Sequence, residues 1–257
     1  MEFVRRVGAL LYGVACYLIF FLTFLYMIGF VGGFVVPKTI DSGSVHPYGW
    51  AIDVVLLASF GLQHSVMARP GWKRFFTQWV PRSVERSSYV LASSAIAILL
   101  FWQWRPLPTQ VWELHDDAAV GVVTAIYLLG YAIVLEATLL IDHFDLFGLR
   151  QVWLRALGRP YTEKRFVTPN LYKHIRHPLY LGWLVTFWAA PTFTVGHLLF
   201  ATAMTSYIML AIPLEENDLA AQLGKPYLDW RERTPMFVPR FRKSAPHTQV
   251  RVPERAR

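Results

Sequence analysis

Four short segments of this chain place histidines, carboxylates and cations at the ends of apolar runs. In YKHIRHPLYLGW, Arg176 and His177 come directly before an apolar stretch; LQHS contains His64, LIDHFD contains His143, and IPLEEND closes a fourth run. Ionisable groups at membrane depth are costly and by default mark functional sites. Such groups either anchor helices among lipid headgroups or together bind a charged cofactor and move protons.

The composition indicates that these segments belong to an integral membrane protein. Of the 257 residues, 54% are hydrophobic and 16% are charged, and the mean hydropathy is +0.35. Soluble domains carry about 25% charged residues. We therefore predict an all-α integral membrane protein rather than a soluble one.

Apolar runs give the expected helices, because a helix needs about 20 apolar residues to cross a bilayer. The runs predict five full transmembrane helices, over residues 8–36, 48–67, 87–104, 118–141 and 193–214. A shorter run over 178–190 precedes the last span and is expected to form a tight C-terminal helical hairpin with it.

The basic residues predict the topology. All but two of the 25 Lys and Arg residues lie before the first span, in alternate connections or after the last span, the exceptions being Lys38 and Arg105. The positive-inside rule then places both termini, and all four reactive segments, in the cytoplasm. The net charge of +8 is accordingly interpreted as a membrane feature, and no nucleic-acid partner is expected. Residues 1–240 are predicted to form one transmembrane domain, and 241–257 a basic, disordered tail.

Each reactive group also has a structural interpretation. His64 could bond a backbone carbonyl at a helix end, Asp145 could pair with Arg150, and Arg176 could anchor a headgroup. Glu136, in the fourth span, has no role that the sequence reveals. No metal is expected, because Pro178 interrupts helical geometry after His177 and no ligand pair has the usual spacing.

Two sets of motifs resemble known membrane enzymes. The pattern RHPLYLG, an apolar hairpin and EENDLAAQLGKPYLDW resembles methyltransferases of the isoprenylcysteine carboxyl methyltransferase type, which bind S-adenosylmethionine at the cytoplasmic face through this C-terminal part. The segments LQHSVMARPGWK, PRSVERSSYVLASS and IDHFDLFGLRQVW are similar to the bacterial methanethiol S-methyltransferases; nurim and the nitrite-reductase-accessory membrane proteins share the QHS-like segment. The similar blocks cover most of residues 60–240.

The resemblance implies an enzyme of the bacterial inner membrane that methylates methanethiol to dimethyl sulfide. Its partners would be the bilayer and a small thiol, and residues 165–240 would bind S-adenosylmethionine. It implies a set of residues that contact or surround this cofactor: Arg176, His177, Tyr180, Gly182, Glu215, Glu216, Tyr227 and Arg231. Arginine or histidine suits the cofactor's carboxylate and glutamate its ammonium and ribose, and Gly182 would permit close approach to the backbone.

Methylation of a thiol requires a base, because a thiol with a pKa of about 8.5 is only a few per cent ionised near neutrality. His64 and His143 are the candidate bases, and the choice between them stays open. Asp142 or Asp145 could orient an imidazole, and Arg82 could stabilise the thiolate. Aromatic side chains are expected to wall the pocket: Trp102, Trp104, Phe144, Phe147 and Trp183.

Three other functions fit parts of the pattern. A methyltransferase for a larger or isoprenylated thiol or carboxyl acceptor would need a wide opening toward the lipid. A membrane reductase with a similar C-terminal motif would bind a nicotinamide cofactor. A non-enzymatic scaffold, as the nurim similarity allows, would bind neither cofactor.

Overall fold

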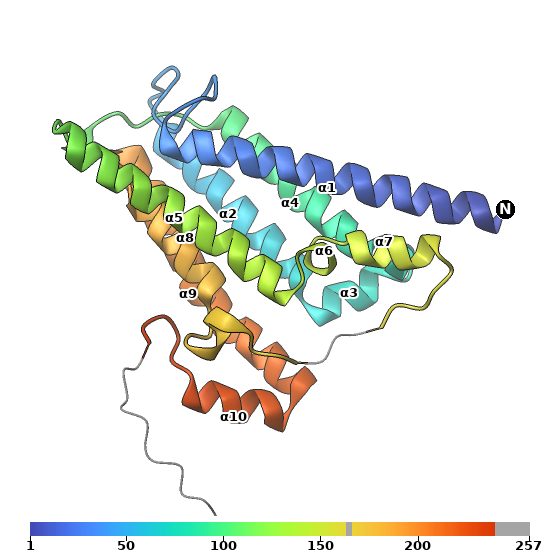
Figure 1. Ribbon diagram of the computed structural model, residues 1–257. Helices are drawn as coiled ribbons and strands as arrows, with labels where there is room; N and C mark the ends of the chain where they lie inside the picture. Colours follow the sequence, from blue (N-terminus) through green and yellow to red (C-terminus); the bar gives the residue numbers. More distant parts are fainter. Residues whose placement is uncertain (163–165, 240–257) are drawn as a thin grey trace, which may run out of the picture.

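The computed structural model describes residues 1–162 and 166–239, so the predicted tail at 241–257 lies outside the described residues. Within those residues, five helices are long and apolar enough to cross a membrane: α1 (Glu2–Gly32), α2 (Gly49–Ala68), α4 (Arg82–Gln103), α5 (Asp117–Ile141) and α9 (Val195–Leu223) (Figure 1). The prediction of an all-α membrane protein with five full spans is confirmed.

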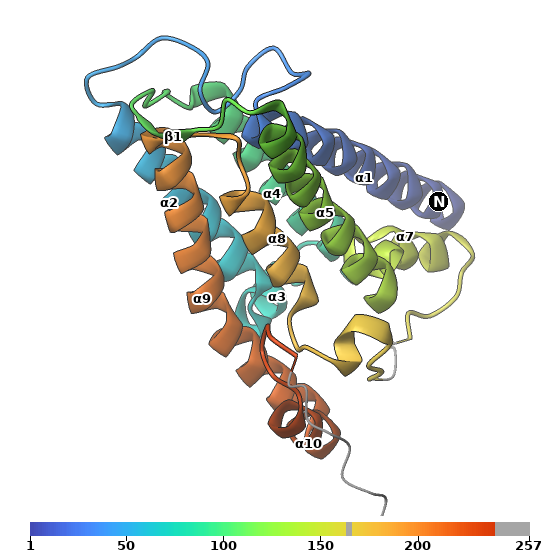
Figure 2. The same ribbon diagram turned by 60° about the vertical axis from the view of Figure 1, so that its left-hand side comes forward.

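The short helix α8 (Pro178–Trp188) packs more extensively against α5 than against α9 (Figure 2). The crossing is close because two glycines meet there: a Cβ on Gly182 would lie 2.7 Å from the carbonyl oxygen of Gly130. Helix α8 is joined to α9 by a short connection and contacts it, as the expected hairpin predicts, but the main partner of α8 is α5. A run of apolar residues predicts a helix but does not say which neighbour its small residues face.

The connections at one end of the bundle form a small sheet that the sequence did not predict. Strands β1 (Gln110–Glu113) and β2 (Thr192–Thr194) pair antiparallel, with Trp112 opposite Phe193. The rings of these two residues stack with centroids 3.9 Å apart. These strands are too short for periodicity to identify them.

Buried polar bonds join the loops at the same end. Asp53, near the start of α2, is 0% exposed and accepts a hydrogen bond from the backbone N–H of Arg105 at 2.9 Å. Thr194 donates its hydroxyl to Asp41 at 2.6 Å. Each bond connects segments far apart in the chain, so this end is held together by loop-to-loop contacts.

The opposite end carries the remaining short helices: α3 (Pro70–Phe76), α6 (His143–Leu146), α7 (Leu149–Ala156), η1 (Asn170–Lys173) and α10 (Lys225–Arg233) (Figures 1 and 2). Helix α9 continues past its predicted end at 214, with Pro213 inside it, and so holds Glu215 and Glu216 on a helix that leads directly toward α10. Glu136 accepts a hydrogen bond from Asn170 Nδ2 at 2.6 Å, which ties η1 to α5 and gives this residue a role.

Candidate active site

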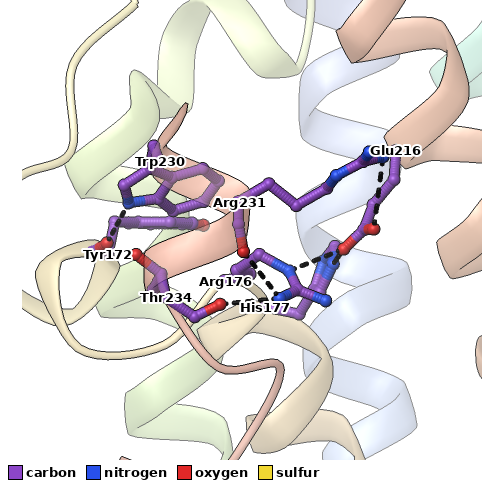
Figure 3. A network of polar contacts seen from close by, with 7 residues as sticks. All are labelled: Tyr172, Arg176, His177, Glu216, Trp230, Arg231 and Thr234. Atoms are coloured by element: carbon purple, nitrogen blue, oxygen red, sulfur yellow. Dashed lines mark hydrogen bonds and ion pairs between the residues drawn. The ribbon is translucent and has the colours of Figure 1, made fainter. Parts of the chain in front are cut away.

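Basic side chains from two segments converge on Glu216 (Figure 3). Arg176 Nε donates to Glu216 Oε1 at 2.8 Å, and His177 Nε2 lies 2.9 Å from the same oxygen. Arg231 Nη1 is 4.0 Å from Oε2. Glu216 is 9% and His177 6% exposed. A carboxylate so buried is stable only when it is paired, and here it has both ionic and hydrogen-bonding partners.

The backbone explains how Arg176 and His177 reach this position. The N–H of Arg176 donates to the carbonyl of Pro235 at 2.9 Å, and that of His177 to Met236 at 3.2 Å. Arg176 Nη1 also donates to the carbonyl of Thr234 at 2.6 Å (Figure 3). Pro178 keeps the residue before it out of the helical conformation, so the helix starts just after His177. The segment following α10 is thereby tied to the start of α8.

Tyr180 and Tyr227 extend the cluster. Tyr180 donates its hydroxyl to Glu215 at 2.8 Å. Tyr227 is 1% exposed, and its hydroxyl has no hydrogen-bond partner among the described residues. Burial, together with the charges of Glu216 and Glu215, raises the pKa of Tyr227 to about 12. Tyr227 therefore offers a neutral buried hydroxyl with a free donor beside two carboxylates.

The structure brings seven of the eight predicted cofactor residues together as a polar cluster, whereas Gly182 lies in the α5–α8 crossing. Its lack of a side chain has a packing cause there, since Gly130 leaves no room for a Cβ. The sequence prediction expected a ligand to approach the backbone at Gly182. In the structure, helix α5 makes that close approach.

His64 is held by two hydroxyls from α4. Its Nε2 lies 2.8 Å from Tyr89 Oη and its Nδ1 lies 3.2 Å from Ser93 Oγ. Ser93 donates its one proton to the carbonyl of Tyr89 at 3.0 Å, so it accepts from His64 Nδ1–H. His64 Nε2 is then the unprotonated nitrogen and accepts from Tyr89.

His143 is held in the same way by α1 and α5. Its Nε2 lies 2.9 Å from Tyr17 Oη, and its Nδ1 lies 2.9 Å from Thr138 Oγ1. Thr138 donates its proton to the carbonyl of Leu135 at 2.8 Å, which again leaves Nε2 as the acceptor. Burial lowers the pKa of His143 from its ordinary value. The hydrogen bonds that the described residues are seen to make with this imidazole come from two hydroxyls.

Three further residues of the sequence prediction have the following positions in the structure. Asp142 accepts from the backbone N–H of Asp145 at 3.1 Å and so caps α6. Asp145 pairs with Arg150 at 3.2 Å, as its structural interpretation predicted. Arg82 is exposed at the first position of α4, whereas Arg86, one turn later, interacts electrostatically with both His64 and Tyr89.

Arg86, Tyr89 and Ser93 are the residues that sequence reasoning missed. They stand at i, i+3 and i+7 of α4 and therefore share one face of that helix. This spacing is the sequence feature from which their common position could have been predicted. Of the expected aromatic walls, Trp104 is 0% exposed and bonds Ile40 at the sheet end of the bundle, with Trp102 beside it. These two tryptophans therefore do not line a pocket with the histidines.

A groove of about 400 Å³ runs along α2 and α3 beside the His64 network, lined by Ser59, Leu62, Gln63, Val66, Met67 and Trp72. Gln63 Nε2 donates to Ser93 Oγ at 3.3 Å, so this residue joins the groove to the network. Gln63 Oε1 and Trp72 Nε1 are buried without hydrogen-bond partners among the described residues.

Fold and site together define an all-helical, polytopic membrane protein with a buried ion cluster and two hydroxyl-bound histidines at one end of its bundle. The chain is 50% identical over 238 residues to methanethiol S-methyltransferase 2 of Bradyrhizobium diazoefficiens, covering 92% of each chain. It is 48% identical over 237 residues to the methanethiol S-methyltransferase of Mycobacterium tuberculosis, covering 91% of this chain and 97% of the relative. The chain belongs to the methanethiol S-methyltransferase family.

Nurim of Danio rerio is a more distant relative, 33% identical over 181 residues that cover 66% of this chain and 64% of nurim. The predicted relationship to both groups is confirmed. No family model and no solved structure matches the chain.

Proposed function

We propose that this chain transfers a methyl group from S-adenosylmethionine to methanethiol and so produces dimethyl sulfide. The observation that carries the proposal is the similarity, over about nine-tenths of the chain, to relatives named as methanethiol S-methyltransferases. The excess of Lys and Arg in alternate connections supports a cytoplasmic site on an inner-membrane protein.

The residues around Glu216 fit this methyl donor. S-Adenosylmethionine has a carboxylate, an ammonium, ribose hydroxyls and an adenine ring, and it supplies an electrophilic methyl group when bound. Glu215 and Glu216 suit the ammonium and ribose, and the free hydroxyl of Tyr227 can donate to an acceptor. Phe166 and Trp230, whose rings lie 5.4 Å apart, give an aromatic wall.

Arg231 is the cation best placed for the donor's carboxylate. Arg176 already donates through Nε to Glu216 and through Nη1 to two backbone carbonyls, and it is less exposed than Arg231. Arg231 lies 4.0 Å from Glu216 and is the most exposed member of the ion cluster. A guanidinium has five N–H donors and binds a carboxylate through two of them. The two glutamates are then held in place by their neighbours: Glu216 by Arg176 and His177, and Glu215 by Tyr180.

The chain must also remove the proton of the thiol, for which His64 and His143 are the candidate bases. Each presents an unprotonated Nε2 to a tyrosine hydroxyl, and a neutral imidazole with a free lone pair is the form that accepts a proton.

The first experiment incubates the purified full chain in detergent with S-adenosylmethionine and methanethiol, with dimethyl sulfide measured by gas chromatography. We expect time-dependent product and, by calorimetry, binding of S-adenosylhomocysteine. Absence of product despite this binding would refute the acceptor, and binding of NADPH in its place would favour a reductase.

Two arginines of α10 give a matched pair for the donor site. Arg231→Gln should weaken binding of S-adenosylhomocysteine about tenfold or more, because a charge-assisted bond to a carboxylate contributes about 1.5–3 kcal/mol. Arg233→Gln should leave binding unchanged, because Arg233 is exposed and donates only to the carbonyl of Asp229 among the described residues. Equal effects of the two substitutions would refute the assignment of Arg231.

A further inference from the structure

The two histidines have the same hydrogen bonds but different surroundings. Around His64, the hydroxyl partner Tyr89 interacts electrostatically with Glu215 and with Tyr207. Tyr180, which donates to Glu215, interacts with both Tyr89 and Tyr207. The hydroxyl partner of His64 therefore lies within electrostatic range of Glu215 and of Tyr180, which belong to the proposed donor site.

No such connection leads from His143. Its ring contacts Tyr17, Phe144 and Phe147, with centroids 5.8, 5.5 and 4.8 Å away. Phe147 in turn stacks on Phe20 of α1 at 3.9 Å. In the part of the chain that the structure describes, this histidine joins α1 to α5 and α6 through its hydroxyl bonds and through aromatic packing.

We propose that Tyr89 and His64 together accept the proton of the acceptor thiol, with Ser93 as the positioning residue and His143 as a structural residue. The proposal rests on the proposed function. Tyr89 gives its only proton to His64 Nε2, so the lone pairs of its oxygen are free to accept from a thiol.

The proton transfer balances within these groups. The S–H bond of the thiol breaks and its proton passes to Tyr89 Oη, while the proton of Tyr89 passes to His64 Nε2. The products are a thiolate, a neutral tyrosine and an imidazolium, which later returns its proton to water. The thiolate's electron pair then forms the new sulfur–carbon bond to the methyl group, while the methyl–sulfonium bond of the donor breaks and its electron pair stays on the donor's sulfur, which leaves as the neutral thioether S-adenosylhomocysteine.

The charge of Arg86 acts on both products of the transfer, because it stabilises the thiolate and repels the imidazolium, which then returns its proton to water. Arg86 of α4 supplies a positive charge close to the thiolate that forms, and Tyr207 of α9 lies edge-on to His64 with centroids 6.2 Å apart. On α2 itself, Phe60 stacks on the imidazole at 5.4 Å. The neutral and aromatic neighbours exclude water, and Arg86 takes the thiolate-stabilising role predicted for Arg82.

The groove lined by α2 and α3 suits a small apolar acceptor. Its lining is predominantly apolar, which suits a one-carbon thiol that dissolves in lipid. The Gln63 amide connects the groove to Ser93, and so to the imidazole. The acceptor can thus come from the bilayer side of α2 while the charged donor comes from the end that carries α10.

The chain offers its own control, because the second histidine has the same bonds. His64→Gln should lower kcat at pH 7 about 100-fold, as expected for loss of a general base. Tyr89→Phe should lower it about 10- to 100-fold for the same reason. The matched Tyr17→Phe should retain the wild-type rate, since Tyr17 lies in the His143 network.

A pH series separates proton transfer from structural damage. The rate of His64→Gln should rise about tenfold from pH 7 to 8, because the free thiolate increases by about that factor below the thiol pKa. The wild type should change much less. Ser93→Ala should lower kcat with little effect on KM, and Ser93→Thr should restore it, because Thr138 performs the same function at His143.

The outcomes distinguish the two proposals. A wild-type chain without product refutes the proposed function and the proton transfer with it. An active wild type with a fully active Tyr89→Phe, or with an equal loss in Tyr17→Phe, refutes only the proton transfer. Binding of S-adenosylhomocysteine reports folding of each variant, and if Tyr89→Phe does not fold, the pH series of His64→Gln decides.

Discussion

The two ends of the helix bundle both bury carboxylates, but they do so differently. At the end that carries α10, Glu216 faces Arg176, His177 and Arg231, three basic groups from two separate segments. At the sheet end, Asp53 accepts one backbone N–H, and its second oxygen has no partner among the described residues. Convergence of several charged groups distinguishes a ligand site from a bond that joins two loops.

The largest expected effect tests the Glu216 cluster. Glu216→Gln should weaken S-adenosylhomocysteine binding about 100-fold and lower the free energy of unfolding by about 3–5 kcal/mol, because it leaves Arg176 buried without a counter-charge. Calorimetry and denaturant unfolding in detergent measure the two effects. Glu232→Gln, on the exposed part of α10, is the control and should change neither.

At the sheet end we expect a substitution to lower stability and to leave the catalytic rate unchanged. Asp53→Ala should lower the free energy of unfolding by about 1–3 kcal/mol, because the N–H of Arg105 loses its acceptor. The rate per folded molecule should stay at the wild-type value. The exposed Glu113→Ala of β1 should affect neither quantity. A loss of kcat in Asp53→Ala would mean that the two ends are not distinct in function.

A smaller effect concerns pH. Because burial lowers the pKa of His143, the unfolded chain binds its proton first as the pH falls below the ordinary value of about 6.5. The contribution of His143 to stability is therefore complete above pH 6.5 and is lost as the pH falls toward its folded pKa. The melting temperature, measured from pH 7.5 to 5, should fall less steeply in His143→Gln than in the wild type. Parallel curves would contradict this.

The smallest effect is expected at Tyr227. Tyr227→Phe removes a hydroxyl that has no partner among the described residues, so the melting temperature should stay the same or rise slightly. Binding of S-adenosylhomocysteine should weaken a few-fold, since a neutral hydrogen bond contributes about 1 kcal/mol. A clear loss of stability with unchanged binding would show that Tyr227 belongs to the fold and not to the donor site.

The sequence predicted the spans because length and apolar content define a transmembrane helix almost by themselves. It also predicted that Arg176, His177 and Glu216 lie at the same end of the bundle, through the convergence of ionisable groups; their role in binding the cofactor stays a prediction. It missed the α5–α8 crossing, because Gly130 and Gly182 are 52 positions apart and nothing local pairs them. The hydroxyl partners of the histidines were missed for the same reason: Tyr17 and His143 meet only in three dimensions.

The number and sequence position of the arginines did not predict which of them faces His64. Both Arg82 and Arg86 precede the third span, and only the helix phase decides which one faces His64. The i, i+3, i+7 pattern of Arg86, Tyr89 and Ser93 defines that phase once α4 is known to begin at Arg82.

Pro213 weakens α9 against bending at one position. Having no N–H, this proline leaves the carbonyl of Met209 without its helical donor, and a helix bends most easily where such a bond is missing. Before Pro213, Phe200 contacts Phe187 of α8 and Tyr207 contacts Phe60 of α2, whereas Glu215, Glu216 and α10 follow it. Arg69, which follows α2, pairs with Asp218 after the proline at 2.9 Å. Bending at Pro213 would move the two glutamates relative to Arg176 and Tyr180, and we expect the donor site to have a hinge at this position. We expect this hinge to govern how fast the spent donor leaves, and a burst of dimethyl sulfide in the first turnover would be its kinetic signature.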